Sequence, residues 1–152
     1  MSDSIDLKLL TLLQKNGRMK RNDLAEKVGL SLPSVSERLR KLEESEVILG
    51  YHAVLDPGKI GKNLTAFIEV TVDSSKHYGS FLTHAKGQDD ILECHAVTGE
   101  PSHLLKVRTT DTRSLEKLLG KIQAWAGVST TRTHLVLSTA KETSEVRIDK
   151  ID

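Results

Sequence analysis

Serine, arginine and lysine side chains crowd one face of a short amphipathic stretch, residues 32–45. Val35, Leu39 and Leu42 fall within one narrow sector at about 100° per residue, which leaves the polar residues opposite. Arginine can pair with guanine through two hydrogen bonds, and serine can bond to base edges or phosphates. This chemistry is that of a helix that contacts DNA. The candidate contacts in and just before it are Ser31, Pro33, Ser34, Ser36, Glu37, Arg38, Arg40 and Lys41.

The charge of the chain is unevenly distributed around this stretch. The formal net charge is only +1, but residues 15–41 hold eight basic and three acidic residues, a net +5. Such a local excess steers a protein toward phosphate even when the total charge is near zero. Arg38 is the candidate base contact, whereas Lys20, Arg21, Arg40 and Lys41 suit phosphate contacts, which add affinity without sequence choice.

Three helices are predicted to position these side chains. The first spans residues 4–16, and Gly17 ends it; the second spans 21–28, and Gly29 ends it. Ser31 can cap the third helix, with Pro33 in its first turn, where a missing N–H costs nothing. Two short helices joined by a tight turn form a helix-turn-helix arrangement, whose second helix enters the major groove. A three-helix bundle that packs against a protein partner is the alternative.

The hydrophobic period changes after residue 47. A connecting strand is expected from Val47, ending at the turn sequence Asp56-Pro57-Gly58. The pattern then predicts strands and helices in the order β-α-β-β-α-β, which is the ferredoxin-like order. The tail after Lys141 is charged and expected to be loose. The expected elements are strands 64–73, 91–97, 103–109 and 131–139 and helices 75–86 and 112–125.

The remaining reactive residues form no pattern of catalysis or metal binding. Six histidines are scattered over five predicted elements without the short spacing of a zinc site. Cys94 and His95 are adjacent, so on a strand their side chains face opposite ways. Glu69 and Glu93 resemble paired acids, but we interpret them as edge or subunit-interface residues. No phosphate loop, dinucleotide motif or nucleophile elbow occurs, so neither a cofactor, a metal nor an enzyme activity is expected.

Cysteine usage and hydropathy predict the compartment. One cysteine forms no intrachain disulfide, which suits a reducing cytoplasm. The N-terminal MSDSIDLKLL lacks the basic region and long apolar run of a signal peptide. No stretch approaches the roughly 20 apolar residues that span a bilayer. We therefore expect a soluble, cytoplasmic protein without a membrane partner.

Three segments carry a resemblance to a known family. They are IDLKLLTLLQKNGRMKRNDLAEKVGLSLPSVSERLRKLEESEVILGYHAVLDPGKIG, then ILECHAVTGEPSHLLKVRTTD, then TTRTHLVLSTAK. Over residues 4–141 the chain resembles the Lrp/AsnC (feast-famine) transcription regulators. The resemblance implies a C-terminal domain that dimerises through its sheet, dimers that assemble into octamers or similar discs, and small effectors, usually amino acids, bound between dimers.

The resemblance also implies an effector loop. Carried over to this chain it comprises Gly99, Glu100, Pro101, Ser102 and His103, with Thr131 and Thr133 lining the same pocket. Many family members read V-T-G-D-x-D-Y-L-L-K-V where this chain reads V-T-G-E-P-S-H-L-L-K-V. Ser102 thus replaces an acid, His103 replaces a tyrosine, and Pro101 removes a backbone donor. Glu46 stands where the family often has glycine.

The expected fold is α+β, with an N-terminal helix-turn-helix three-helix domain followed by a ferredoxin-like βαββαβ domain. The expected boundaries are 1–46 for the DNA-binding domain, 47–62 for the connecting strand and linker, 63–141 for the effector-binding and oligomerisation domain, and 142–152 for the tail. The expected function is sequence-specific regulation of transcription from a double-stranded operator, modulated by a small molecule such as an amino acid. A DNA-organising regulator without an effector, and a ferredoxin-like enzyme or metabolite-binding protein with a helical appendage, stay open as alternatives.

Overall fold

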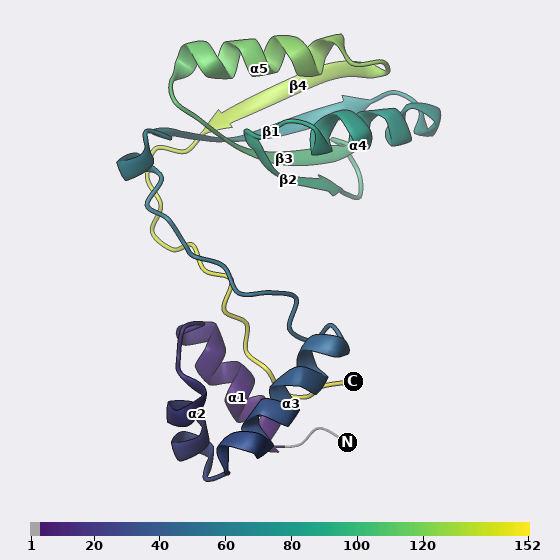
Figure 1. Ribbon diagram of the computed structural model, residues 1–152. Helices are drawn as coiled ribbons and strands as arrows, with labels where there is room; N and C mark the ends of the chain where they lie inside the picture. The colour runs from purple at the N-terminus through teal and green to yellow at the C-terminus, as the bar shows by residue number, and fades with distance from the viewer. Residues whose placement is uncertain (1–3) are drawn as a thin grey trace. The chain divides into compact units, whose positions relative to one another are not determined.

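The structure is a computed structural model that describes residues 4–152 (Figure 1). The chain forms two compact units. The helical unit comprises the N-terminal helices up to Val54 together with Lys141–Asp152, and the sheet unit comprises Leu55–Ala140. The predicted α+β class, with three helices followed by a ferredoxin-like domain, is confirmed.

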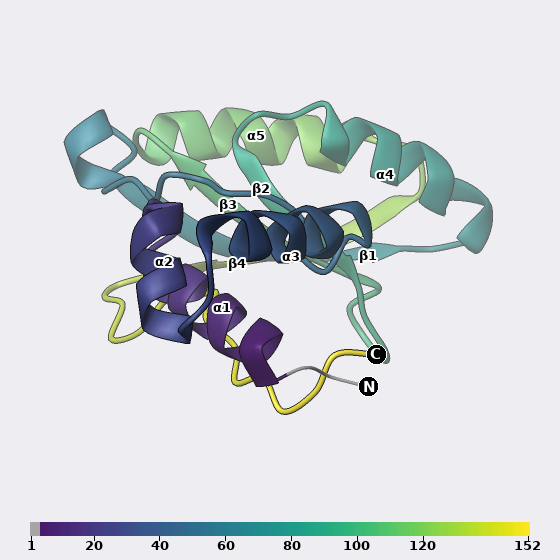
Figure 2. The same cartoon turned by 60° about the horizontal axis from the view of Figure 1, so that its bottom comes forward.

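Three short helices build the helical unit: α1 (Ser4–Lys15), α2 (Arg21–Val28) and α3 (Leu32–Glu44). Figure 2 shows all three from a second direction. The predicted inner stripe of α3 is buried, and it packs with Leu9 of α1 and Leu24 of α2 in one aliphatic core. The turn between α2 and α3 contains Gly29 at φ 70°, a left-handed conformation that glycine adopts without strain. This turn brings α3 across α2 in the helix-turn-helix arrangement.

The sheet unit is a four-stranded antiparallel sheet in the order β2-β3-β1-β4. This is the strand order that a βαββαβ chain gives when each helix connects strands that are not neighbours. The strands are β1 (Leu64–Val72), β2 (Ile91–Ala96), β3 (His103–Thr109) and β4 (Val128–Leu135), and the helices are α4 (Tyr78–Lys86) and α5 (Thr112–Ala124). Short 3-10 turns occupy Gly58–Ile60 and Ser75–His77.

Both long helices of the sheet unit cover the same face of the sheet. Phe81 of α4 and Ile122 of α5 are fully buried against alternate residues of β1, among them Ile68 and Val70. The period-2 burial of β1 follows from this one-sided cover, because successive side chains point to opposite faces. The other face of the sheet carries no helix of the unit (Figure 1).

The connecting segment differs from the prediction. A strand was expected from Val47, but the structure has no strand within residues 47–62, a range that it describes in full. A strand needs a neighbouring strand to which it can hydrogen-bond. In the described chain all strand pairs are formed among β1 to β4, so residues 47–62 have no strand partner. Most apolar side chains of this segment are instead exposed, with Leu49 at 89% and Val54 at 95% of their full exposure, whereas Ile48 packs against the helical core.

The last strand and the tail also differ. β4 spans Val128–Leu135, not 131–139: its last paired residue is Leu135, opposite Ala66 of β1, and beyond it the Val136 N–H donates to the Thr65 carbonyl at 2.9 Å. The tail, expected to be loose, is part of the helical unit. Its Val146 N–H donates to Gln14 Oε1 at 2.7 Å, and Gln14 Nε2 donates to the Val146 carbonyl at 2.9 Å.

Candidate nucleic-acid interface and effector loop

The N-terminal half of α3 presents the predicted polar face. The Ser31 hydroxyl accepts the Ser34 backbone N–H at 3.3 Å and thereby caps α3, as its sequence predicts. Pro33, Ser34 and Glu37 are exposed. Short side chains at this end let the helix backbone approach a groove closely, so the geometry suits insertion of α3 into DNA.

Arg38 has a partner inside the helical unit, and its contact with a base stays a prediction. Its Nη1 donates to Asp6 Oδ1 of α1 at 3.1 Å, and the two side chains are only 29% and 23% exposed. The ion pair ties α3 to α1 inside the helical unit. A carboxylate already holds the guanidinium, so a base contact by Arg38 requires that this bond be broken. Asp6 is not recognisable as the partner from local sequence signals, because 32 residues separate it from Arg38.

Arg40 is held by acids of its own helix. Its Nε and Nη2 donate to the two carboxylate oxygens of Glu37 at 3.0 and 2.7 Å, and its Nη1 donates to Glu44. The hydrogen bonds from Arg40 lower the pKa of the Glu37 carboxyl, and those to Glu37 and Glu44 raise the pKa of Arg40. Lys41 Nζ also lies 3.9 Å from Glu37. The exposed face of α3 is therefore a mixed network rather than a purely basic one.

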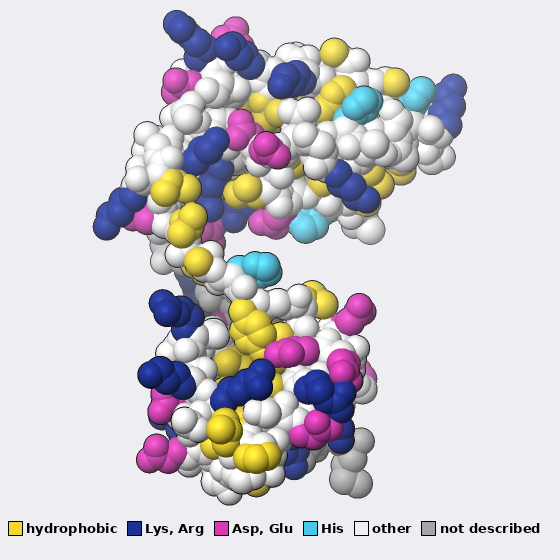
Figure 3. Space-filling view, in the orientation of Figure 1, with side chains coloured by type: hydrophobic (Ala, Val, Ile, Leu, Met, Phe, Trp, Pro, Cys, Tyr) yellow, Lys and Arg dark blue, Asp and Glu magenta, His cyan; other side chains and the backbone are white. Residues whose placement is uncertain are grey.

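The start of α2 supplies exposed cations beside α3. Arg21 Nη1 donates to the Ser36 hydroxyl at 3.2 Å, which links the first turn of α2 to the middle of α3. Lys20 precedes α2 and is exposed. Figure 3 shows basic and acidic side chains next to one another on the helical unit. Lys20 and Arg21 are thus exposed close to α3, and their contact with phosphate stays a prediction.

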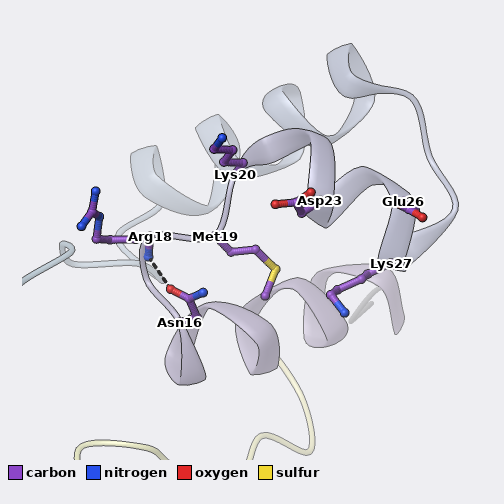
Figure 4. A pocket seen from close by; sticks show the side chains of 7 residues that line it. All are labelled: Asn16, Arg18, Met19, Lys20, Asp23, Glu26 and Lys27. Atoms are coloured by element: carbon purple, nitrogen blue, oxygen red, sulfur yellow. Dashed lines mark hydrogen bonds between the residues drawn. The ribbon is translucent and has the colours of Figure 1, made fainter.

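A shallow hollow lies where α1 turns into α2 (Figure 4). Within it the backbone N–H of Arg18 donates to Asn16 Oδ1 at 3.0 Å, which fixes the turn. Cations and acids share its rim, so it is a feature of the polar surface and not a deep ligand pocket. The residues around it are Asn16, Arg18, Met19, Lys20, Asp23, Glu26 and Lys27.

Tyr51 was not among the predicted site residues, yet it fixes the segment that leaves α3. Its hydroxyl donates to Glu43 Oε1 at 2.9 Å. Burial, together with this hydrogen bond to a carboxylate, raises the pKa of Tyr51 to about 12. The preceding turn contains Glu46 at φ 60°, a left-handed conformation, which accounts for glycine being favoured there.

The effector loop places two of its predicted residues inward. The Ser102 hydroxyl donates to the Val70 carbonyl at 3.1 Å, accepts the Val72 N–H at 2.9 Å and lies 2.9 Å from His103 Nδ1. His103 is fully buried, and its ring packs against Tyr78 and Phe81 at centroid distances of 4.8 and 4.7 Å. The burial of His103 lowers the pKa of its imidazole. Both side chains contact their own chain, but the buried Nε2 of His103 has no hydrogen-bond partner among the described residues, so a role of these residues toward a ligand stays a prediction.

The two threonines predicted to line the pocket lie across the sheet from this loop. His103 of β3 and Thr131 of β4 both pair with Val70 of β1, so the three residues form one row across the sheet. Directly opposed residues share a face, which places Thr131 on the helix-covered side. Its hydroxyl accepts Gln123 Nε2 of α5 at 3.0 Å. Thr133 follows two residues on, opposite Ile68.

The other loop residues are more accessible. Gly99 and Glu100 are exposed and Pro101 is half-buried. Gly99 has φ 77°, a conformation that suits glycine at the end of a hairpin. The Val97 N–H donates to the Ser102 carbonyl at 3.0 Å and closes the hairpin between β2 and β3. In one chain, then, the loop offers a carboxylate and backbone groups rather than a complete pocket.

The uncovered sheet face carries the two glutamates that resembled paired acids. Glu69 is on the central strand β1 and not at an edge, and its Oε2 lies 2.6 Å from His134 Nε2. Glu93 lies on the edge strand β2, 2.9 Å from His95 Nε2 and 3.5 Å from Lys106 Nζ. Each acid has its own basic partner, so they do not form a general acid–base pair.

No group of three His, Cys, Asp or Glu side chains within residues 4–152 gathers as a metal site. No helix among these residues is long and apolar enough to cross a membrane. Cys94 is half-buried, and burial raises the pKa of its thiol, which disfavours the reactive thiolate.

Comparison with known proteins matches both units to families. Residues 2–48 match a winged helix-turn-helix DNA-binding family, and residues 65–146 match the Lrp/AsnC ligand binding domain. The leucine-responsive regulatory protein of Haemophilus influenzae is 38% identical over 145 residues, covering 93% of this chain and 87% of the relative. The proline dehydrogenase transcriptional activator of Rhizobium radiobacter is 39% identical over 144 residues, covering 93% and 92%.

Solved structures agree over nearly the whole length. A transcriptional regulator from Neisseria meningitidis in complex with L-Met has a TM-score of 0.91 at 30% identity, covering 96% of each chain. A feast or famine regulatory protein from M. tuberculosis complexed with L-methionine has a TM-score of 0.89 at 32% identity, covering 96% of this chain and 99% of that one. The chain belongs to the Lrp/AsnC family of DNA-binding transcription regulators.

Proposed function

We propose that α3 enters the major groove of an operator and that its N-terminal half contacts base edges. The observation that carries this proposal is the Ser31-capped end of α3, exposed through Pro33, Ser34 and Glu37 and linked to α2 by the Arg21–Ser36 bond. Lys20 and Arg21 are proposed to contact phosphate, which supplies affinity without sequence choice. Arg38 is proposed to hold α3 in place through Asp6.

The proposed working form is an assembly of at least two copies in the cytoplasm. The support is the apolar surface left exposed by one chain: Leu49, Val54 and Leu137 are 89%, 95% and 95% exposed, and Phe67 lies on the uncovered sheet face. Exposed apolar side chains on neighbouring segments favour association. A dimer would address palindromic half-sites about one helical turn, or a multiple, apart, and octamers are the larger assembly we propose.

The proposed effector is an amino acid bound where the loop from Gly99 to His103 meets a second copy. Glu100 offers a carboxylate for an ammonium group, and backbone N–H groups suit a carboxylate. Two similar structures hold L-methionine, which makes it the first ligand to test. No catalytic step is part of the proposal.

A regulator that organises DNA without an effector is the second candidate. The observation that favours it is the engagement of the Ser102 hydroxyl with β1, which leaves the loop one side chain fewer for a ligand.

Fluorescence anisotropy tests the proposal. The duplex upstream of the protein's own coding region is compared with a shuffled duplex of the same length at two salt concentrations, with and without L-methionine or L-leucine. Preference for the native duplex that persists at higher salt supports sequence-specific regulation. Equal binding that salt abolishes reflects phosphate attraction alone and contradicts it at that site. A ligand that changes neither operator affinity nor assembly size favours the second candidate.

A further inference from the structure

The last twelve residues of the described chain, Lys141–Asp152, lie on the helical unit although the whole sheet unit precedes them. The Gln14 carboxamide bonds both the N–H and the carbonyl of Val146, at 2.7 and 2.9 Å. A side-chain amide paired with both backbone groups of one residue reproduces the pairing of two strands. It therefore fixes the tail against α1 at this point.

Beyond Val146 the tail reaches the flank of α3. Ile148 and Ile151 are half-buried, whereas the other residues of 141–152 are exposed. Ile151 and Asp152 line one hollow whose walls include residues from Asp6 of α1 and from α3. The α3 residues in that hollow that also belong to the predicted DNA surface are Pro33, Ser34, Glu37, Arg38 and Lys41. The end of the tail thus borders the same hollow as five residues of the proposed DNA-contacting surface.

The contacts that hold the tail are weak. Arg147 Nε pairs with Asp149 at 3.3 Å and Lys150 Nζ pairs with Asp152 at 2.9 Å, so the charges of the tail are paired within the tail itself. All four side chains are at least 74% exposed, and exposed pairs of this kind contribute little. These two ion pairs therefore do not attach the tail to α3.

We propose that residues 147–152 form an autoinhibitory segment that lies beside one flank of the recognition helix and must leave before a duplex binds there. The inference rests on the proposed function of α3. A segment docked about 70–90% of the time lowers the apparent DNA affinity by about 3- to 10-fold, because only the uncovered fraction is competent. The autoinhibition acts on every sequence, since the tail lies in the path of the duplex before any base is contacted.

Two substitutions in the full chain test the segment without deleting it. Gln14→Ala removes both hydrogen bonds to Val146, and Ile151→Ala removes the half-buried side chain beside α3. Gln123→Ala, which removes the bond to Thr131 in the sheet unit, is the matched control. We expect both tail variants to bind the operator about 3- to 10-fold more tightly than the wild type and the control to bind as the wild type.

Tryptic cleavage after Arg147 and Lys150, followed by mass spectrometry, reports the position of the tail directly. We expect a saturating duplex to accelerate this cleavage several-fold in the wild type, and Gln14→Ala to be cleaved rapidly without DNA. Unchanged or weaker DNA binding by both tail variants, or slower cleavage with DNA, overturns the inference. If neither the wild type nor any variant binds a duplex, the proposed function fails and the inference fails with it.

Discussion

The ion pair between Asp6 and Arg38 gives the sharpest test of how α3 is used. Both side chains are less than one-third exposed, at 23% and 29%, and one 3.1 Å bond joins them. Exposed ion pairs contribute about 0.2–1 kcal/mol, and hydrogen bonds to charged groups about 1.5–3 kcal/mol. A pair of intermediate burial is expected to couple by about 1 kcal/mol. We therefore expect a cycle of Asp6→Asn, Arg38→Gln and the double variant to return this coupling.

The single tryptophan provides an internal control for this cycle. Trp125 lies in the sheet unit, where its ring contacts Phe81 at 5.6 Å, so its fluorescence follows that unit. Urea unfolding is recorded by far-UV circular dichroism and by Trp125 fluorescence on the same samples. We expect the variants to weaken the helical transition and to leave the fluorescence transition unchanged.

DNA binding by the same variants decides what Arg38 does. Because the guanidinium is held by Asp6, we expect Arg38→Gln to weaken binding to the operator and to a shuffled duplex by the same small factor. A direct contact to guanine would instead cost about 1–3 kcal/mol at the operator alone. A selective loss at the operator, with no coupling to Asp6, would refute the structural role of this residue.

Three further predictions follow from single residues. Burial lowers the pKa of His103 from its ordinary 6.5, so the unfolded chain binds more protons below that pH, and the stability of the sheet unit falls as pH falls through it. His103→Leu should reduce the difference between urea midpoints followed by Trp125 fluorescence at about pH 7.5 and about pH 5.5; an unchanged difference contradicts this. Lys20→Ala should weaken binding to all duplexes alike and reduce the salt slope by about 0.9, measured by anisotropy over a salt series. A loss confined to the operator would assign Lys20 to base contact. Glu46→Gly relieves a residue at φ 60° and should raise the stability of the helical unit by about 0.5–1 kcal/mol, measured by urea unfolding followed by circular dichroism. A loss of stability would show that the Glu46 side chain outweighs its backbone strain.

Local signals in the sequence predicted the elements that carry the site. Ser31 and Pro33 mark the start of α3 through capping chemistry that acts within four residues, and the structure has the same cap. The spacing of Val35, Leu39 and Leu42 predicted the buried side of that helix. The order of strands and helices was likewise sufficient for the ferredoxin-like topology, because few arrangements connect them without crossing.

Contacts between residues far apart in the sequence could not be predicted from such local signals. Gln14 and Val146 are separated by 132 positions, and neither residue type marks a tail for docking. Arg38 has the chemistry of a base contact, but its partner Asp6 lies on another helix. The end of β4 was misplaced because strand propensity extends to residue 139, whereas the available partner strand does not. In each case a tertiary partner decided the outcome.

The effector loop has a consequence for how a ligand must bind. Ser102 is engaged with β1 and Thr131 is bonded to α5, so a single chain offers chiefly Glu100, backbone groups and the unpartnered but buried Nε2 of His103. An amino acid needs partners for both of its charged ends, and in the proposed function a second copy supplies those that are missing. Binding and assembly are then linked, and each strengthens the other by the same factor.

This linkage is measurable without knowing the operator. We expect the affinity for L-methionine, measured by calorimetry, to rise with protein concentration over the range in which sedimentation shows the copies associating. We also expect the ligand to shift that association to lower protein concentration by the same factor, since the coupling is reciprocal. An affinity that stays constant while the assembly forms would mean that one copy holds the whole ligand. The hydrogen bonds of Ser102 to β1 and the packing of His103 would then have to break when the ligand binds. The loop would be a site that rearranges within one chain, and no second copy would be needed to complete it.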